Sequence, residues 1–255
     1  MRFVDSHVHI TDYDNPDSLI RYATATEGLL VSAAIDEESS IRSLLLGARF
    51  RGVVRPFVGV HPSAADRELS LDWLKQAALT AAGLGEVGLD PRYSDISEPS
   101  PQMRTLLVQL ELAERLGKAV QVHSRGAEAA CIEKLTSHRL TKVLLHWFEG
   151  EELIAAAAEK GYYVSFGPAL LYSKKLSRMA TTYPEDLILA ESDGPVSFSA
   201  LGGASGPHLI PSVVFRLAEL RRRAFEDMTE ILFRNALVYL GTGRKVNHHT
   251  KKGLK

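Results

Sequence analysis

The amino-acid sequence predicts an α/β protein, a single-domain (β/α)₈ TIM-type barrel. Three observations lead to this prediction: eight short β-rich apolar runs recur along the 255 residues, segments of helical period separate them, and no Pro- or Ser-rich linker divides the chain. Strand followed by helix, repeated eight times, is typical of a closed parallel barrel rather than an open sheet. The expected strands cover residues 3–10, 29–35, 53–61, 83–89, 119–123, 142–146, 162–166 and 187–191.

Helix start and stop signals lie between these runs. Asn15 and Ser100 each precede a proline, a pattern typical of an N-cap followed by proline at the first helical position. Asp227 with Glu230 matches a capping box for the last helix. Glycines are expected to end three helices, at Gly117, Gly161 and Gly241.

Composition predicts a globular domain with a short tail. Hydrophobic residues make up 45% of the chain and charged residues 24%, which is enough apolar material for a sizeable core. We expect residues 1–241 to form the barrel and residues 197–211 to be a long irregular loop within it. Residues 242–255 are expected to form a basic, flexible tail, for which a solvated terminus is a simpler interpretation than a nucleic-acid arm.

Charge and cysteine content exclude several classes of protein. The net charge of −1 gives no global field that would attract nucleic acid or a membrane, so a polyanionic substrate would have to be held locally. The single cysteine, Cys131, excludes an intrachain disulfide and a Cys-rich zinc module, and its apolar neighbours predict a buried helix position. No signal peptide or apolar run of about 20 residues is present, so we expect a cytoplasmic protein without membrane association.

Two histidines and an aspartate alternate along the first expected strand. Because side chains alternate across a strand, Asp5, His7 and His9 point to one side. Two imidazoles so placed, on a strand directed at the barrel mouth, can chelate one divalent ion. The alternative is that each histidine is a hydrogen-bonded core residue, but the spacing of the three residues favours the metal.

More donor side chains lie at or near the ends of the other expected strands. They are His61, Glu86, His123, His146 and Asp193. Active sites of such barrels form at the carboxyl ends of the strands, so these side chains should meet at one rim. Burying so many polar groups without a ligand would be costly, and a metal cluster would satisfy them together. Nitrogen and oxygen donors without cysteine suit Zn²⁺, Mn²⁺ or Mg²⁺, and the histidines favour the first two.

The donors can be divided between two divalent ions. His7, His9 and Asp193 are assigned to one metal, His123 and His146 to the other, and Glu86 to a bridging position. Two metals about 3.5–4 Å apart can clamp a phosphoryl group and lower the pKa of a nucleophilic water. The sequence therefore predicts a metal-dependent hydrolase.

Taken in order, these residues resemble the TatD family of metal-dependent deoxyribonucleases, within the wider amidohydrolase-like barrels. The resemblance extends from Asp5 to Asn235 and includes residues 59–62, 85–90, 122–125, 146–148, 165–167 and 191–195. It implies a (β/α)₈ barrel, a two-metal centre and phosphodiester hydrolysis, commonly as a 3′→5′ exonuclease on DNA. Position by position it implies six metal ligands: His7, His9, Glu86, His123, His146 and Asp193. Glu86 and Asp193 are thus the expected catalytic residues, with Asp193 as general base for the water.

The sequence departs from the family pattern at three places. Ser192 stands where threonine is usual, and Trp147 stands where a smaller residue is usual, which alters the pocket wall. The loop at residues 202–208 lacks the arginine common there, which weakens the case for DNA because phosphate contacts supply much of the affinity. His61 and Arg125 remain as candidate phosphate contacts, with structural roles as the alternative.

Two other functions stay open beside the phosphodiesterase. A small-molecule amidohydrolase or lactonase could use the same barrel, but many of that group bridge their metals with a modified lysine, and here Glu86 occupies the fourth strand. A metal-binding barrel without turnover is the third possibility. The expected partner is DNA or another phosphodiester substrate, and no protein partner is predicted.

Overall fold

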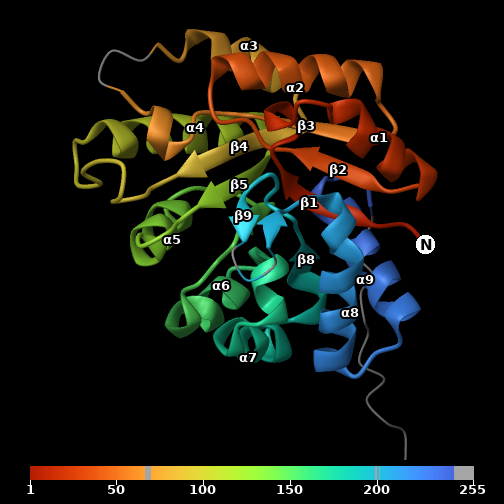
Figure 1. The fold of residues 1–255 in the computed structure, drawn as a ribbon. Helices are drawn as coiled ribbons and strands as arrows, with labels where there is room; N and C mark the ends of the chain where they lie inside the picture. The colour runs from red at the N-terminus through yellow and green to blue at the C-terminus, as the bar shows by residue number, and fades with distance from the viewer. Residues whose placement is uncertain (67–69, 199, 201, 244–255) are drawn as a thin grey trace, which may run out of the picture.

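Eight parallel strands form a nearly closed barrel, as the sequence predicts (Figure 1). The computed structural model describes residues 1–66, 70–198, 200 and 202–243, so the expected tail lies outside the described residues from position 244 onward. The strands are β1 Val4–Val8, β2 Leu29–Ser32, β3 Val54–Val58, β4 Gly83–Gly88, β5 Ala119–His123, β6 Val143–Leu145, β7 Tyr163–Phe166 and β8 Ile188–Ala190. Each strand from β1 to β7 pairs in parallel with the next strand in the sequence.

Helices alternate with the strands and lie around the outside of the barrel (Figure 1). They are α1 Pro16–Ala25, α2 Glu37–Arg49, α3 Asp72–Thr80, α4 Pro101–Leu116, α5 Glu128–Thr136, α6 Ile154–Glu159, α7 Lys174–Thr182, α8 Ile210–Arg221 and α9 Phe225–Tyr239. Because helices cover the outside and side chains fill the inside, every residue of β1, β2, β4 and β7 is buried. Burial on both faces explains why most residues of β2 and β7 are apolar, whereas β1 and β4 also carry the buried polar residues Asp5, His7 and Glu86.

The barrel is closed by hydrogen bonds between β1 and the chain around the end of β8. The amide of Asp193 donates to the carbonyl of His7 at 3.0 Å, and the amide of His9 donates to the carbonyl of Gly194 at 2.8 Å. The Ser6 hydroxyl also donates to the carbonyl of Ala190 at 2.8 Å. These bonds bring the carboxyl end of β8 against that of β1, so side chains from both ends of the sequence share one rim.

The start signals of the helices were only partly correct. The Ser100 hydroxyl accepts a hydrogen bond from the amide of Met103 at 3.2 Å, so it caps α4 as predicted. The first helix begins at Pro16 as predicted, but Asn15 makes no side-chain capping bond. Gly117 ends α4 with φ +61°, the left-handed conformation that favours glycine.

The capping box predicted for the last helix was wrong. Helix α9 begins at Phe225, with Ala224 at its N-cap, so Asp227 lies inside the first turn. An acidic side chain in the first turn is stabilised by the partial positive charge of the helix N-terminus. Asp227 therefore marks the start of the helix without capping it.

The segment at residues 197–211 is more ordered than an irregular loop. Strand β9, Ser197–Phe198, pairs antiparallel with β10, Gly203–Ala204. A 3₁₀ turn at Pro207–Leu209 then leads directly into α8. In Figure 1 this small hairpin lies in front of the barrel strands.

Cys131 has the buried helical position that the sequence predicts. It lies in α5 with no exposed surface, and burial raises the pKa of its thiol to about 12. The thiolate is the reactive form, so this cysteine is not a candidate nucleophile. Among the residues described, no helix has the length and apolar character needed to cross a membrane.

Candidate metal centre

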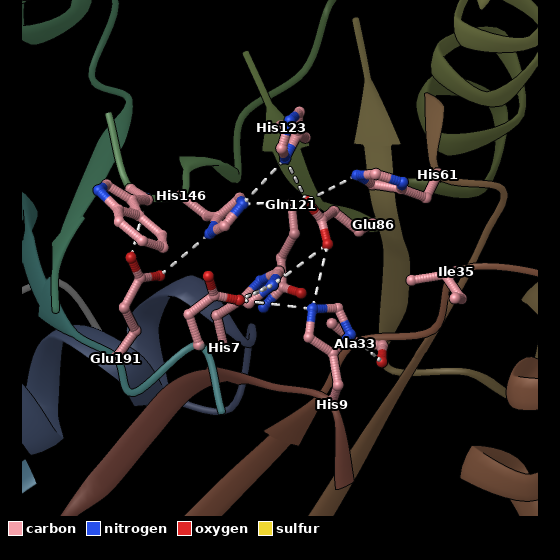
Figure 2. Close-up of polar contacts among 12 residues, drawn as sticks. His7, His9, Ala33, Ile35, His61, Glu86, Gln121, His123, His146 and Glu191 are labelled. Carbon is pink, nitrogen blue, oxygen red and sulfur yellow. Dashed lines mark hydrogen bonds and ion pairs between the residues drawn. The ribbon is translucent and has the colours of Figure 1, made fainter. Parts of the chain in front are cut away.

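The carboxylate of Glu86 lies at the centre of a group of five histidines (Figure 2). Its Oε2 atom lies 3.4 Å from Nε2 of His7 and 3.3 Å from Nε2 of His9. Its Oε1 atom faces the other three rings, at 2.6 Å from Nδ1 of His123, 2.9 Å from Nε2 of His146 and 3.5 Å from Nε2 of His61. The two oxygens therefore face two separate sets of imidazoles.

The second carboxylate at this rim belongs to Asp193, which follows β8. Its Oδ1 atom lies 3.6 Å from Nε2 of His7 and 3.4 Å from Nε2 of His9. The backbone of Asp193 has φ +50°, and its amide is held by the carbonyl of His7. The left-handed backbone is unusual for a residue other than glycine and is found where the surrounding structure fixes a functional side chain.

All six residues predicted as metal ligands thus come together at the carboxyl ends of β1, β4, β5, β6 and β8. Three sets of three residues hold donor atoms that all lie within 4.8 Å of one another. The sets are His7, His146 and Asp193; His7, His9 and Glu86; and His61, Glu86 and His123. His61, which the sequence predicts only as a substrate contact, belongs to one of these sets. It therefore lies next to two of the expected metal ligands, Glu86 and His123.

Asp5 does not join this group, although it lies on the same strand. Its Oδ1 atom accepts hydrogen bonds from the amides of Ser192 at 2.9 Å and His7 at 3.4 Å. Its Oδ2 atom has no hydrogen-bond partner, and burial raises the pKa of the carboxyl group to about 8. Asp5 holds the backbone that joins β1 to the end of β8.

His9 and His123 each have a hydrogen-bond partner on the nitrogen that faces away from Glu86, and the corresponding nitrogen of His146 lies near a carboxylate without a hydrogen bond. Nδ1 of His9 lies 3.2 Å from the carbonyl of Ala33, and Nε2 of His123 lies 2.9 Å from Oδ2 of Asp90. Nδ1 of His146 lies 3.5 Å from Oε2 of Glu191, which also accepts from the Ser165 hydroxyl at 2.6 Å. An outer acceptor of this kind orients a metal-binding imidazole and fixes the position of its proton.

The surroundings of the His7 ring show whether these residues fit a metal ion. Its ring is fully buried, and neither ring nitrogen has a hydrogen-bond partner. It stacks on His146 with ring centroids 3.9 Å apart, so no water-filled space separates the two rings. A buried polar group without a partner is costly, and a cation between the rings and the carboxylates would satisfy it. The donor set therefore fits a divalent metal.

The pKa values at the site favour ionised carboxylates. Burial alone would raise the pKa of Glu86, but the positive charge of His146 and the hydrogen bond to His123 hold it well below its usual range. Asp193 behaves in the same way, because its contacts with the histidines outweigh burial and lower its pKa. Both carboxylates are therefore available as anionic ligands at neutral pH.

The two candidate phosphate contacts lie on the side of the site next to His123. Burial lowers the pKa of His61 to about 4, so its ring is neutral at physiological pH and can offer a hydrogen bond but no charge. Its Nδ1 accepts from the amide of Ser63 at 3.1 Å. The side chain of Arg125 is 46% exposed and pairs with the buried Asp90, which leaves part of the guanidinium open to a ligand.

Sequence reasoning missed two residues around Arg125. Asp90 directly follows β4, and its carboxylate contacts both His123 and Arg125. Tyr93 lies three residues further on, with its ring in edge contact with His61 at 5.5 Å and beneath the Arg125 guanidinium at 5.8 Å. The signal for Asp90 was present, since a carboxylate at the end of a barrel strand is a candidate site residue.

Trp147 forms a wall of the site on the side next to His146. Its ring stacks on Phe198 of β9, with centroids 5.1 Å apart. Its backbone has φ +40°, and its amide donates to Oε1 of Glu191 at 2.8 Å. The large side chain predicted to alter the pocket wall is thus packed against the hairpin that follows Asp193.

Comparison with known proteins agrees with this geometry. The family model described as TatD related DNase matches residues 4–241. The chain is 30% identical to the putative deoxyribonuclease TATDN3 of Mus musculus, covering 91% of this chain and 86% of that protein. It is 29% identical to the deoxyribonuclease TATDN3 of Homo sapiens, covering 92% and 93% respectively.

A solved structure leads to the same family. The TatD homologue YJJV of Escherichia coli superposes with a TM-score of 0.80 at 26% identity, covering 93% of this chain and 97% of that one. A hydrolase of the TatD family from Entamoeba histolytica has the same TM-score at 15% identity, which shows a shared fold. The family model, the curated relatives and the fold agree over nearly the whole chain, and the protein belongs to the TatD family of metal-dependent hydrolases.

Proposed function

We propose that the protein is a divalent-metal-dependent phosphodiesterase, a deoxyribonuclease of the 3′→5′ exonuclease type. The observation that carries the proposal is the position of Glu86, whose two oxygens face separate sets of imidazoles, as a carboxylate bridging two metals would. Membership of the TatD family and the deoxyribonuclease relatives support DNA as the substrate.

Six side chains would hold two divalent ions, of which zinc, manganese and magnesium are the candidates. His7, His9 and Asp193 would hold one ion, His123 and His146 the other, and Glu86 both. Bound there, divalent ions would neutralise charge on the phosphoryl oxygens and lower the pKa of the nucleophilic water.

Asp193 is placed to act as the general base. Its carboxylate lies beside His7 and His9, and its lowered pKa keeps it ionised at neutral pH. When water attacks the phosphorus atom, Asp193 accepts the proton of the water as the bond from phosphorus to the leaving oxygen breaks. Glu86 stays ionised at the same time because of its own histidine contacts.

Arg125 and His61 are the proposed contacts of the substrate phosphate. Arg125 offers a half-exposed cation, and the neutral ring of His61 offers a hydrogen bond from Nε2, because Nδ1 already accepts from Ser63. The exposed residues Gly202, Gly203 and Ala204 of the hairpin after β8 carry no charge. So few contacts suit an enzyme that holds one end of a strand better than one that grips a long duplex.

The proposal is tested by digestion of an end-labelled single-stranded oligonucleotide. Protein stripped of metal with a chelator would receive Mg²⁺, Mn²⁺ or Zn²⁺ separately, with Asp193→Asn as the control. Metal-dependent shortening from the 3′ end, absent in the variant, is the expected result. Shortening from the 5′ end or internal cleavage would overturn the exonuclease type. No cleavage by protein that binds two ions would favour a small-molecule hydrolase instead.

A further inference from the structure

Asp90 is a buried carboxylate shared by two side chains of different kinds. Its Oδ2 atom accepts from Nε2 of His123 at 2.9 Å, and from Nε and Nη2 of Arg125 at 2.9 and 2.6 Å. Its Oδ1 atom accepts from the amide of Arg92 at 2.9 Å. The side chain has no exposed surface, so every one of these bonds is formed away from water.

The backbone of Asp90 is fixed as firmly as its side chain. The amide of Asp90 donates to Oε1 of Gln102 at 2.8 Å, and Nε2 of Gln102 donates to the carbonyl of Asp90 at 2.9 Å. Gln102 is itself fully buried in the first turn of α4. The carboxylate is therefore held in one place by both the strand end and the following helix.

This placement dictates which nitrogen of His123 can act as a ligand. A neutral imidazole carries one ring proton, and the nitrogen that bears it donates to the acceptor that faces it. Asp90 faces Nε2 and Glu86 faces Nδ1, so a metal ion held beside Glu86 would take the lone pair of Nδ1, and the one ring proton would lie on Nε2, facing Asp90. The opposite proton position would direct a lone pair at the Asp90 carboxylate and a proton into the ligand cluster.

We infer that Asp90 is a positioning residue that fixes His123 as an Nδ1 metal donor and holds Arg125 over the same rim, so that metal site and phosphate contact form one unit. The part that concerns Arg125 rests on the proposed function, whereas the part that concerns His123 does not. Glu191, the corresponding carboxylate behind His146, accepts hydrogen bonds from Ser165 and Trp147 and lies near the ring of His146. Asp90 differs because it also pairs with a half-exposed cation.

The substitution Asp90→Asn tests the inference with little change in shape. The amide has no charge to hold Arg125 and can donate as well as accept, so it no longer dictates the proton position of His123. We expect the dissociation constant for zinc or manganese, measured by competition with a chromophoric chelator, to rise about 10- to 100-fold. The second measurement is NMR of zinc-loaded protein carrying ¹⁵N-histidine. The pair of ring-nitrogen resonances that disappears in His123→Gln is assigned to His123. In Asp90→Asn the Nε2 and Nε2–H resonances of His123 should shift.

Asp95→Asn is the matched control. Asp95 lies in the same loop after β4 but is exposed, and its carboxylate accepts hydrogen bonds from Ser97, through the amide at 2.9 Å and the hydroxyl at 2.6 Å. This variant should bind metal and show the His123 spectrum like the unmodified protein. A dissociation constant within twofold of the unmodified value in Asp90→Asn, with an unchanged His123 spectrum, would overturn the inference.

Two further variants separate the effect of Asp90 on His123 from its effect on Arg125, and one of them leaves Asp90 itself unchanged. In an Arg125→Ala background, adding Asp90→Asn should weaken metal binding further but should leave KM for the oligonucleotide where Arg125→Ala alone puts it. Arg125→Ala by itself should move the Nε2 proton shift of His123, because both side chains bind the same carboxylate oxygen. An unmoved shift would exclude a shared role even if Asp90→Asn failed to fold.

The outcomes distinguish this inference from the proposed function. If the unmodified protein cleaves no oligonucleotide but Asp90→Asn alters metal affinity and the His123 spectrum, the positioning role of Asp90 at the metal site stands without the nuclease. If the oligonucleotide is cleaved and Asp90→Asn leaves metal affinity, spectrum and KM unchanged, the nuclease stands without the positioning role.

Discussion

Single side chains at the barrel rim are oriented before any ligand arrives. The outer nitrogens of His9 and His123 are hydrogen-bonded to Ala33 and Asp90, and that of His146 lies 3.5 Å from the carboxylate of Glu191. The inner nitrogens therefore face the carboxylates of the site. Preorganisation of this kind lowers the cost of ordering side chains when a ligand binds.

At this scale the clearest prediction concerns Asp193. The substitution Asp193→Asn keeps the shape of the side chain but removes the group that would accept the proton of the attacking water. We expect kcat to fall about 10²- to 10⁴-fold, with a much smaller change in KM. Steady-state kinetics on the oligonucleotide would measure both constants.

A parallel Asp12→Asn variant controls for the loss of a carboxylate nearby on the chain. Asp12 lies in the 3₁₀ turn after β1, and its carboxylate accepts from the hydroxyl of Thr11 at 3.2 Å. Near-normal turnover in Asp193→Asn would remove Asp193 from the role of base.

The ligand candidates could be predicted because strand alternation and strand ends are visible in the sequence. His7 lies in β1 and His9 directly after it, and Glu86, His123 and His146 lie in or directly after later strands. The partners of these residues could not be predicted in the same way. The bond between His123 and Asp90 joins two strands 33 residues apart, and it depends on a register that no local pattern specifies.

At the scale of elements, the N-caps of α4 and α1 can be compared within the same protein. Ser100→Ala should lower the free energy of unfolding by about 0.5–2 kcal/mol, because the amide of Met103 loses its acceptor at a helix start. Asn15→Ala in α1 should change it far less, because Asn15 occupies the same N-cap position without a side-chain bond. Urea denaturation monitored by circular dichroism would measure both variants. Equal effects would mean that the Ser100 hydroxyl contributes nothing specific.

The positions of the strands and most helices could be predicted because burial of one or both faces sets the spacing of apolar residues along the sequence. Every residue of β1, β2, β4 and β7 is buried, so apart from a few polar residues, among them the site residues His7 and Glu86, these runs are made of apolar residues and glycine and stand out from the helices between them. The pair β9 and β10 was missed because each strand has two residues, too few for a period. Its position depends on tertiary contacts such as the stack of Phe198 on Trp147.

At the scale of the whole molecule, the candidate ligands come from around the barrel. His7 lies in β1, Glu86 in β4, His123 in β5, and His146 and Asp193 directly after β6 and β8. Segments 186 residues apart in the sequence therefore share one set of donor atoms, since His7 and Asp193 belong to the same group. Ions bound there would connect the two ends of the chain across the closure between β8 and β1.

Metal binding should therefore stabilise the whole fold and not only the site. A ligand that binds only the folded state at 100 times its dissociation constant contributes about 2.7 kcal/mol. For a chain of this size that corresponds to a rise in Tm of roughly 5–10 °C.

Chelator-stripped protein titrated with Mn²⁺ or Zn²⁺ in a thermal melt should show this rise, and elemental analysis should give about two ions per chain. In Glu86→Ala both the rise and the ion count should fall, whereas Glu133→Ala, which removes a 73% exposed carboxylate from α5, should leave them unchanged. A full rise and an undiminished ion count in Glu86→Ala would contradict the bridging position of Glu86, whose two oxygens face separate sets of histidines.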